Sequence, residues 1–249
     1  QWAQSGTFRE ASGLICLSEY TRNYLTQFHS HFTKQTAIRV IAHGTEKIKN
    51  GHLVSDIKKN PNNDTLKLLY VSTVKKYKHQ WNLIDAVGLL RKEGVSIELH
   101  LIGGGDSQAL HWMKESIQRN STDCEFIFYH GSLPHAKTLE WYQKADMFVF
   151  PSTCETFGIG LLEAMSAGLP IASSDRGPMP EILKDAGLYF NPESISSIKN
   201  CLQYMIANPD LRMQLGVKAK QYSEHYSWKK CADETFTFFR SVYESVVVQ

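Results

Sequence analysis

A regular alternation of short apolar runs and longer helical segments, from about residue 66 to residue 226, constrains the fold of this chain more than any other feature. The apolar runs are rich in aromatic and β-branched residues, as strands are. Strands that alternate with helices favour a parallel sheet, because parallel neighbours need a crossover connection. We therefore predict an α/β fold with a doubly wound, Rossmann-like parallel sheet. Its ligand crevice should lie beyond the carboxyl ends of the strands.

The predicted elements follow one another without a long interruption. We expect strands at residues 66–72, 96–104, 124–131, 147–150, 170–173 and 188–190. Helices are expected over residues 81–92, after Asp106, over 137–144, from about 157 to 168, near Glu181, and twice more before Tyr226. The loops at the strand ends should carry the functional residues.

The first part of the chain reads differently. Residues 13–18 and 37–42 look like strands on either side of a helix over residues 19–32, which makes one βαβ piece. The polar residues 46–64 look like a linker. A last helix over residues 228–246 carries Phe236, Phe239 and Tyr243 at helical intervals, so it should have an apolar stripe to bury.

Composition excludes several classes of protein. A hydrophobic fraction of 42% and a net charge of +2 are typical of a soluble globular chain with no global attraction to nucleic acid or membranes. The 5 cysteines form no CxxC, which favours free thiols in a reducing compartment. No apolar run approaches the roughly 18–20 residues that span a bilayer. We expect a cytoplasmic protein, with peripheral contact to the inner membrane surface left open.

Residues 146–168 hold the strongest functional signal. An apolar strand stopped by Pro151 is followed by a helix that begins near Phe157 and Gly158. The amides and the positive dipole end of such a helix attract phosphate. Glu155 and Glu163 repel it, so their partners should be hydroxyl groups, and the pattern indicates a sugar joined to a phosphate. The alternative is that Glu155 caps a helix and Glu163 is an exposed helical acid.

The sequence around these two glutamates carries a family resemblance. Glu155 and Glu163 form an E-x7-E pattern inside the segment FVFPSTCETFGIGLLEAMSAGLP at residues 148–170, which is followed by PEIL at residues 180–183. This combination resembles the retaining GT-B glycosyltransferases of family four. The resemblance covers about residues 12–243 and is densest over residues 129–183.

The resemblance implies roles for three loops. Lys78 matches the lysine of the loop that neutralises the donor diphosphate. Thr73 stands where an arginine is expected, so either Lys75 or Lys76 substitutes for it or the positive charge of the loop is weaker. The loop with Gly104 would line the nucleotide site. In the third loop, main-chain groups near Leu133 would pair with the base, and Lys137 would reach a phosphate.

For the central segment, the resemblance implies that Glu163 binds the ribose hydroxyls and that Glu155 holds a hydroxyl of the donor sugar. Amides of Phe157, Gly158 and Ile159 would contact the sugar and phosphates. The two residues with catalytic roles would be Glu155 and Lys78. No metal site is expected: there is no HExxH and no Asp-x-Asp in a strand context, and the helix dipole and lysines would stabilise the leaving diphosphate instead.

The resemblance also implies a domain division. Residues 1–50 would be the tail of an amino-terminal acceptor domain that is otherwise missing, and 51–64 a linker. Residues 65–226 would form the nucleotide-sugar-binding domain, and 227–249 a helix that crosses back to the first domain. The first residue, Gln1, fits a fragment of a longer protein.

We therefore expect a retaining glycosyltransferase that moves a sugar from a nucleoside diphosphate to a hydroxyl acceptor, a glycan or a lipid-linked acceptor, in surface polysaccharide or lipopolysaccharide assembly. Two alternatives stay open. The chain alone is a nucleotide-sugar-binding module without transferase activity, or it is a hydrolase that uses both glutamates. The hydrolase is disfavoured because Glu163 should lie about two turns into its helix, behind the phosphate site.

Overall fold

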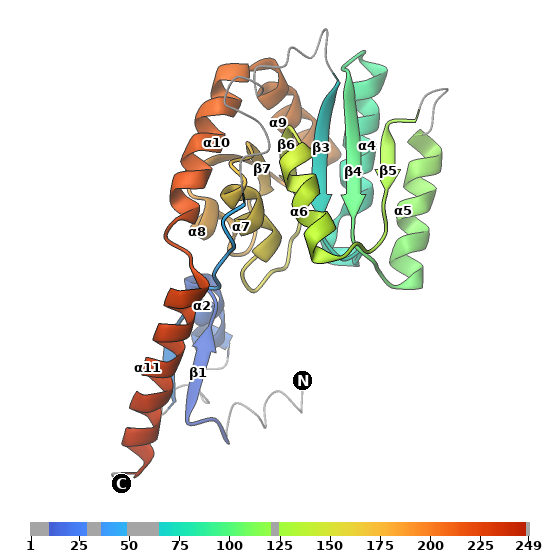
Figure 1. Ribbon diagram of the computed structural model, residues 1–249. Helices are drawn as coiled ribbons and strands as arrows, with labels where there is room; N and C mark the ends of the chain where they lie inside the picture. The colour runs from blue at the N-terminus through green and yellow to red at the C-terminus, as the bar shows by residue number, and fades with distance from the viewer. Residues whose placement is uncertain (1–9, 29–35, 49–64, 121–124, 248–249) are drawn as a thin grey trace.

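The computed structural model describes residues 10–28, 36–48, 65–120 and 125–247 (Figure 1). Its large sheet has six parallel strands in the order β5-β4-β3-β6-β7-β8. The bounds of these strands are β3 Leu66–Val71, β4 Ile97–Ile102, β5 Ile127–Tyr129, β6 Met147–Phe150, β7 Ile171–Ser174 and β8 Gly187–Phe190. The strand order reverses between β3 and β6, as in a doubly wound Rossmann sheet, so the predicted fold class is confirmed.

Helices cover both faces of this sheet (Figure 1). On one face α4 packs against α5 and α9, whereas α6 lies over β3 on the other face and α7 packs against α10. The helices are α4 Gln80–Lys92, α5 Ser107–Asn120, α6 His135–Lys144, α7 Ile159–Ser166, α8 Met179–Leu183, α9 Ile195–Ala207 and α10 Pro209–Ser223, with a short 3-10 helix η2 at Lys76–Lys78. The helices are therefore close to their predicted positions.

The centre of the sheet is apolar on both faces. All four residues of β6 are buried, which explains why this strand reads as a continuous apolar run and does not alternate. Leu161, Leu162 and Met165 of α7 are also fully buried. Each such side chain contributes roughly 1.5–3 kcal/mol of hydrophobic stabilisation. The helix that follows β6 is thus held firmly against the sheet.

A second, smaller unit lies next to the large sheet. It contains the parallel pair β1 Gly13–Cys16 and β2 Ala37–Val40, the helix α2 Glu19–Phe28 and the long helix α11 Trp228–Val247 (Figure 1). The predicted end of the first helix near residue 32 and the predicted linker 51–64 lie outside the described residues.

The prediction that the apolar stripe of helix α11 is buried is wrong. Phe236, Phe239 and Tyr243 are exposed, and Phe236 keeps 71% of its surface open to solvent. Phe238 is the buried residue of the helix, where it packs near Gly13 of β1. The spacing of the apolar residues correctly predicted a helix, but it did not identify the face of that helix that packs against β1. Phe239 and Tyr243 line an open apolar groove beside β1.

Hydrogen bonds join the smaller unit to the large one. Ser18 Oγ and Thr21 Oγ1 both donate to the carbonyl of Thr156, at 2.9 and 3.0 Å. The carboxylate of Glu181 in α8 accepts from the backbone amides of Glu19 and Tyr20, at 2.9 Å each. The start of α2 therefore rests on the loop that precedes α7.

Two further expectations concern thiols and membranes. Cys16, Cys154, Cys201 and Cys231 are free, and Cys124 lies outside the described residues. Within the described part of the chain, no helix combines the length and apolar character needed to cross a bilayer.

Candidate functional site

The loops after β3, β4 and β5 meet at the carboxyl edge of the sheet, as predicted. The amide of Val74 donates to the carbonyl of Gly104 at 2.7 Å, and the amide of Gly103 donates to that of Gly131 at 2.8 Å. A Cβ at Gly104 would lie 2.5 Å from Ser132 Oγ, so the second and third loops touch. The switch point between β3 and β6 thus opens onto three adjoining loops.

Lys78 and Glu155, the two residues expected to have catalytic roles, form an ion pair. Their side chains are only 10% and 14% exposed. The Lys78 ammonium also lies 5.4 Å from the ring centre of Tyr77 and 5.8 Å from that of Phe150. A poorly hydrated charge needs such partners. The pair was not predicted, because the two residues come from different loops.

The backbone around Lys78 is fixed by its neighbours. Tyr70 Oη donates to the carbonyl of Lys78 at 2.9 Å. The next residue, His79, has a φ of 50°, which is uncommon for a residue with a side chain. Its Nε2 lies 3.2 Å from Thr153 Oγ1, so the strained turn is tied to the segment that carries Glu155. Lys78 is therefore held in one place.

The helix α7 begins at Ile159, one residue later than the latest predicted start, and Gly158 occupies its N-cap. Gly158 has a φ of 96°, where glycine is favoured because it has no Cβ. The Phe157 ring is buried between His43 and Tyr226. The first amides of an α-helix lack partners within the helix, so this end can accept an anion.

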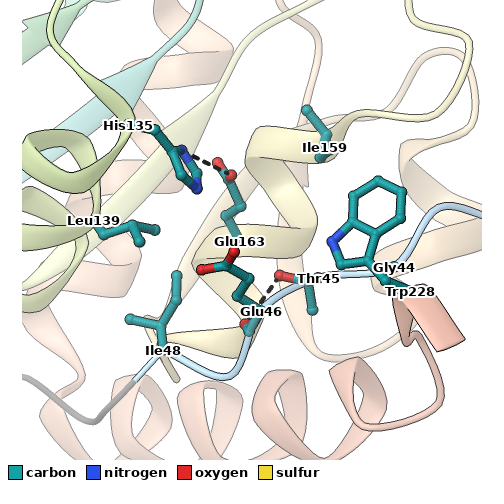
Figure 2. Close-up of a pocket in the computed structure, with 9 residues that line it drawn as sticks. All are labelled: Gly44, Thr45, Glu46, Ile48, His135, Leu139, Ile159, Glu163 and Trp228. Atoms are coloured by element: carbon teal, nitrogen blue, oxygen red, sulfur yellow. Dashed lines mark hydrogen bonds and ion pairs between the residues drawn. The ribbon is translucent and has the colours of Figure 1, made fainter.

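Glu163 lies one turn into α7, not two as expected from the sequence. Its side chain is 16% exposed, and its Oε2 accepts a hydrogen bond of 2.9 Å from Tyr142 Oη. Its Oε1 lies 3.9 Å from His135 Nδ1 (Figure 2). Burial raises the pKa of the Glu163 carboxyl, while Tyr142 and His135 act to lower it and Glu46 raises it further. The interpretation as an exposed helical acid is therefore wrong.

A cavity of about 190 Å³ opens beside Glu163 (Figure 2). It lies between α6, α7, the segment that follows β2 and the start of α11. Its lining residues are Gly44, Thr45, Glu46, Ile48, His135, Leu139, Ile159, Glu163 and Trp228. Apolar walls with a few polar groups are typical of small-molecule sites.

Several members of this site were not identified from the sequence. These residues come from three separate stretches of the chain, so no local motif joins them: Glu46 follows β2, His135 and Tyr142 lie in α6, and Trp228 begins α11. Ser166 fixes the segment with Glu46, because its Oγ donates to the Glu46 carbonyl at 2.8 Å and accepts from the Ile48 amide at 3.2 Å. Because Ser166 follows Glu163 by three residues, the helical spacing alone places the two side chains on the same side of α7.

The remaining predicted residues lie around the same edge. Leu133 packs against the core just before α6. Lys137 is exposed and pairs with Glu140 at 2.7 Å, and it does not line the cavity beside Glu163. Lys75 pairs with Asp106 at 3.1 Å, where the first and second loops meet. The phosphate contact of Lys137 stays a prediction, and it would need the pair with Glu140 to open.

Over residues 10–28, 36–48, 65–120 and 125–247, no group of three or more His, Cys, Asp or Glu side chains is arranged to hold a metal ion.

The chain is similar to several curated glycosyltransferases. It is 29% identical to the O-antigen chain mannosyltransferase B of Escherichia coli over 175 residues, which cover 69% of this chain and 45% of that protein. It is 26% identical to the alpha-monoglucosyldiacylglycerol synthase of Streptococcus pneumoniae over 214 residues, which cover 83% of this chain and 47% of that one. The chain thus spans about half the length of these relatives.

Solved structures share the fold. A sucrose-phosphate synthase from Thermosynechococcus elongatus matches with a TM-score of 0.82 at 22% identity, over 98% of this chain and 61% of that one. Anabaena HepE, solved in complex with UDP and glucose, matches with a TM-score of 0.75 at 19% identity, over 93% of this chain and 63% of that one. These likenesses confirm the predicted GT-B type of fold.

The family model described as "Glycosyl transferases group 1" matches residues 55–222. This range includes β3 to α9 and all but the last residue of α10, and therefore the whole large sheet with its strand-end loops. The chain belongs to the group 1 glycosyl transferase family.

Proposed function

We propose that this chain carries the donor site of a retaining glycosyltransferase, which moves a sugar from a nucleoside diphosphate to a hydroxyl group. One observation carries the proposal: the free end of α7, the Lys78–Glu155 pair and the half-buried Glu163 all adjoin the switch point of the sheet. An anion-attracting helix start with a carboxylate on each side fits a diphosphate that links two polyols.

Glu163 binds the ribose in this proposal. Its Oε2 is occupied by Tyr142, whereas its Oε1 is directed at the cavity and can accept from ribose hydroxyls. Hydrogen bonds to a charged acceptor are roughly twice as strong as neutral ones. The amides of Phe157, Gly158 and Ile159 then meet the phosphates, and main-chain groups near Leu133 and Gly104 border the base.

Lys78 and Glu155 act together on the donor. An ammonium has three donors, so Lys78 can keep its bond to Glu155 while it approaches a phosphate. The bond from the anomeric carbon to the diphosphate breaks, and the acceptor oxygen forms its bond on the same face. The acceptor proton passes to the departing phosphate. Lys78 and the helix start stabilise the leaving charge, and Glu155 orients the sugar without acting as a nucleophile.

The acceptor is a glycan or a lipid-linked glycan of a surface polysaccharide or lipopolysaccharide in this proposal, and the reaction takes place in the cytoplasm. Support comes from two relatives, a mannosyltransferase of O-antigen chains and a synthase of a glycosyl diacylglycerol. The acceptor-binding domain would build on β1 and β2, because parallel sheets are normally covered on both faces.

A second candidate function is a nucleotide-sugar-binding module without activity of its own. It is favoured by the length comparison, in which this chain covers 45% and 47% of two curated transferases. Donor turnover separates the two candidates. A module binds the nucleotide sugar but transfers nothing to water or to an added acceptor.

The test of the donor site is the Glu163→Ala variant. Calorimetry with UDP, GDP and ADP should show that the chain binds one of them, and the variant should bind it roughly 10- to 100-fold more weakly, as expected for lost bonds to a charged group. The midpoint of thermal unfolding should change little, because the half-buried charge is removed along with its bond. Glu115→Ala, on the exposed face of α5, is the matched control. If Glu163→Ala and Glu115→Ala bind the nucleotide with equal affinity, Glu163 is not part of the site.

A further inference from the structure

Tyr142 of α6 is a fully buried residue that contacts the site without lining it. Its Oη donates to Glu163 Oε2 at 2.9 Å and lies 3.2 Å from the carbonyl of Gly160. Its ring packs at a centroid distance of 5.6 Å from the ring of Phe148 in β6. The hydroxyl is thus fixed by the core at the point where α6 and α7 touch.

This contact leaves the two oxygens of Glu163 in different situations. Oε2 is bound to the tyrosine, whereas Oε1 lies toward His135 and the cavity (Figure 2). Burial and the neighbouring Glu163 raise the pKa of the Tyr142 hydroxyl well above its ordinary value. The hydroxyl therefore stays protonated and donates throughout the neutral range.

We propose that Tyr142 is a positioning residue for nucleotide recognition, which holds Glu163 Oε2 and thereby presents Oε1 to the ribose hydroxyls. This inference rests on the proposed function of Glu163 and assigns a further residue to the same site. Tyr142 acts through Glu163 and does not touch the ligand.

The charged and titratable groups around Glu163 determine the direction in which its pKa should shift in each variant. His135 and Tyr142 face it from α6, and Glu46 faces it from the segment after β2. The first two lower the pKa of Glu163 and the third raises it. Loss of Tyr142 should therefore raise the pKa of Glu163, and loss of the Glu46 charge should lower it. Because the ionised carboxylate is the better acceptor, affinity is lost as pH falls through this pKa.

The experiment compares Tyr142→Phe with the unaltered chain by calorimetry from pH 5 to pH 8.5. The probe is whichever of UDP, GDP and ADP the unaltered chain binds most tightly. The variant should bind roughly 10-fold more weakly at pH 7, the loss typical of one hydrogen bond to a charged group. The pH at which half of the affinity is lost should move upward. Tyr222→Phe is the matched control, since it removes a 2.8 Å tyrosine bond to Asp185 and neither residue lines the cavity.

A double-mutant cycle separates positioning from general damage. If Tyr142 acts through Glu163, Tyr142→Phe should cause no further loss of affinity in a Glu163→Gln background. A further loss of the same size there would contradict the proposal. Glu46→Gln leaves the core intact and should move the pH profile downward. This arm gives a result even if Tyr142→Phe does not fold, and an unmoved profile would count against the charge arrangement.

The possible failures are distinguishable. If the unaltered chain and Tyr142→Phe bind the probe equally at every pH, the role of Tyr142 is refuted and the donor site stands. If the unaltered chain binds none of the three nucleotides, the donor site itself is refuted, and the role of Tyr142 falls with it.

Discussion

Lys78 and Glu155 are each other's main partner in a poorly hydrated place. An unpaired charge there would be costly, since removing one member of a buried pair typically costs 3–5 kcal/mol. At 10% and 14% exposure this pair is slightly more accessible, so the cost should be lower. In the proposed donor site, the pair also means that a diphosphate would not meet a free ammonium. It would meet a lysine whose position is already set by a carboxylate and two aromatic rings.

Replacing Lys78 with Ala should weaken binding of the nucleoside diphosphate roughly 10-fold or more, since a charge-assisted phosphate contact is lost. Affinity for the nucleoside alone should fall much less, because the nucleoside has no phosphate. Both are measured by calorimetry. Lys92→Ala is the control, as an exposed lysine in the last turn of α4. Equal losses for nucleoside and diphosphate would contradict a phosphate role for Lys78.

The start of α7 is the element that brings the residues of the proposed donor site together. It follows β6 at the centre of the sheet, its N-cap is Gly158 in the left-handed region, and Glu163 lies one turn further along. The loop before it is joined to the smaller unit, since Thr156 accepts hydrogen bonds from Ser18 and Thr21. Movement of that unit would therefore act directly on the residues next to Glu155.

Gly158→Ala tests this element. Space for a Cβ is available at ordinary contact distance, so the cost comes from the backbone and should be about 1–2 kcal/mol. Gly94→Ala is a close match, because Gly94 also has a positive φ, of 84°, and lies in open space after α4. Both variants should lower the unfolding midpoint by similar amounts. Nucleotide affinity should fall in Gly158→Ala alone, and an equal affinity in the two would show that the helix start does not bind the phosphates.

Most elements could be predicted because their signals are local. The apolar run of β6, Pro151 and the glycine after α7 set boundaries that the structure reproduces within a residue or two. The contacts between Lys78 and Glu155 and between Tyr142 and Glu163 could not be predicted in this way. These contacts depend on the packing of elements that are far apart in the sequence. From the sequence alone, Tyr142 is indistinguishable from the other residues on the apolar face of its helix.

At the scale of the whole molecule, the segments that connect the two units of the chain lie beside the site. The ring of His43, just after β2, contacts both Phe157 before α7 and Trp228 at the start of α11. Trp228 and the segment around Glu46 also line the cavity. The site is therefore built by both units, although the family model itself covers residues 55–222. The division into domains at residues 50, 64 and 226 stays a prediction.

The apolar groove between β1 and α11 belongs to this scale as well. Ile15, Phe239 and Tyr243 are among its lining residues, and no local signal in the sequence told which of the aromatic residues of α11 would be buried. Helix α11 packs one face against β1 and leaves the neighbouring face exposed, and both faces carry aromatic residues. The period of the apolar residues predicted the helix but not the side that would meet β1.

The most direct test of the donor site is a crystal structure of this chain with a bound nucleoside diphosphate, chosen among UDP, GDP and ADP by thermal shift. We expect the ribose hydroxyls within hydrogen-bond distance of Glu163 Oε1, with Oε2 still bound to Tyr142, and the diphosphate between Lys78 and the first amides of α7. A nucleotide bound elsewhere, with Glu163 in contact with Tyr142 alone, would contradict the account.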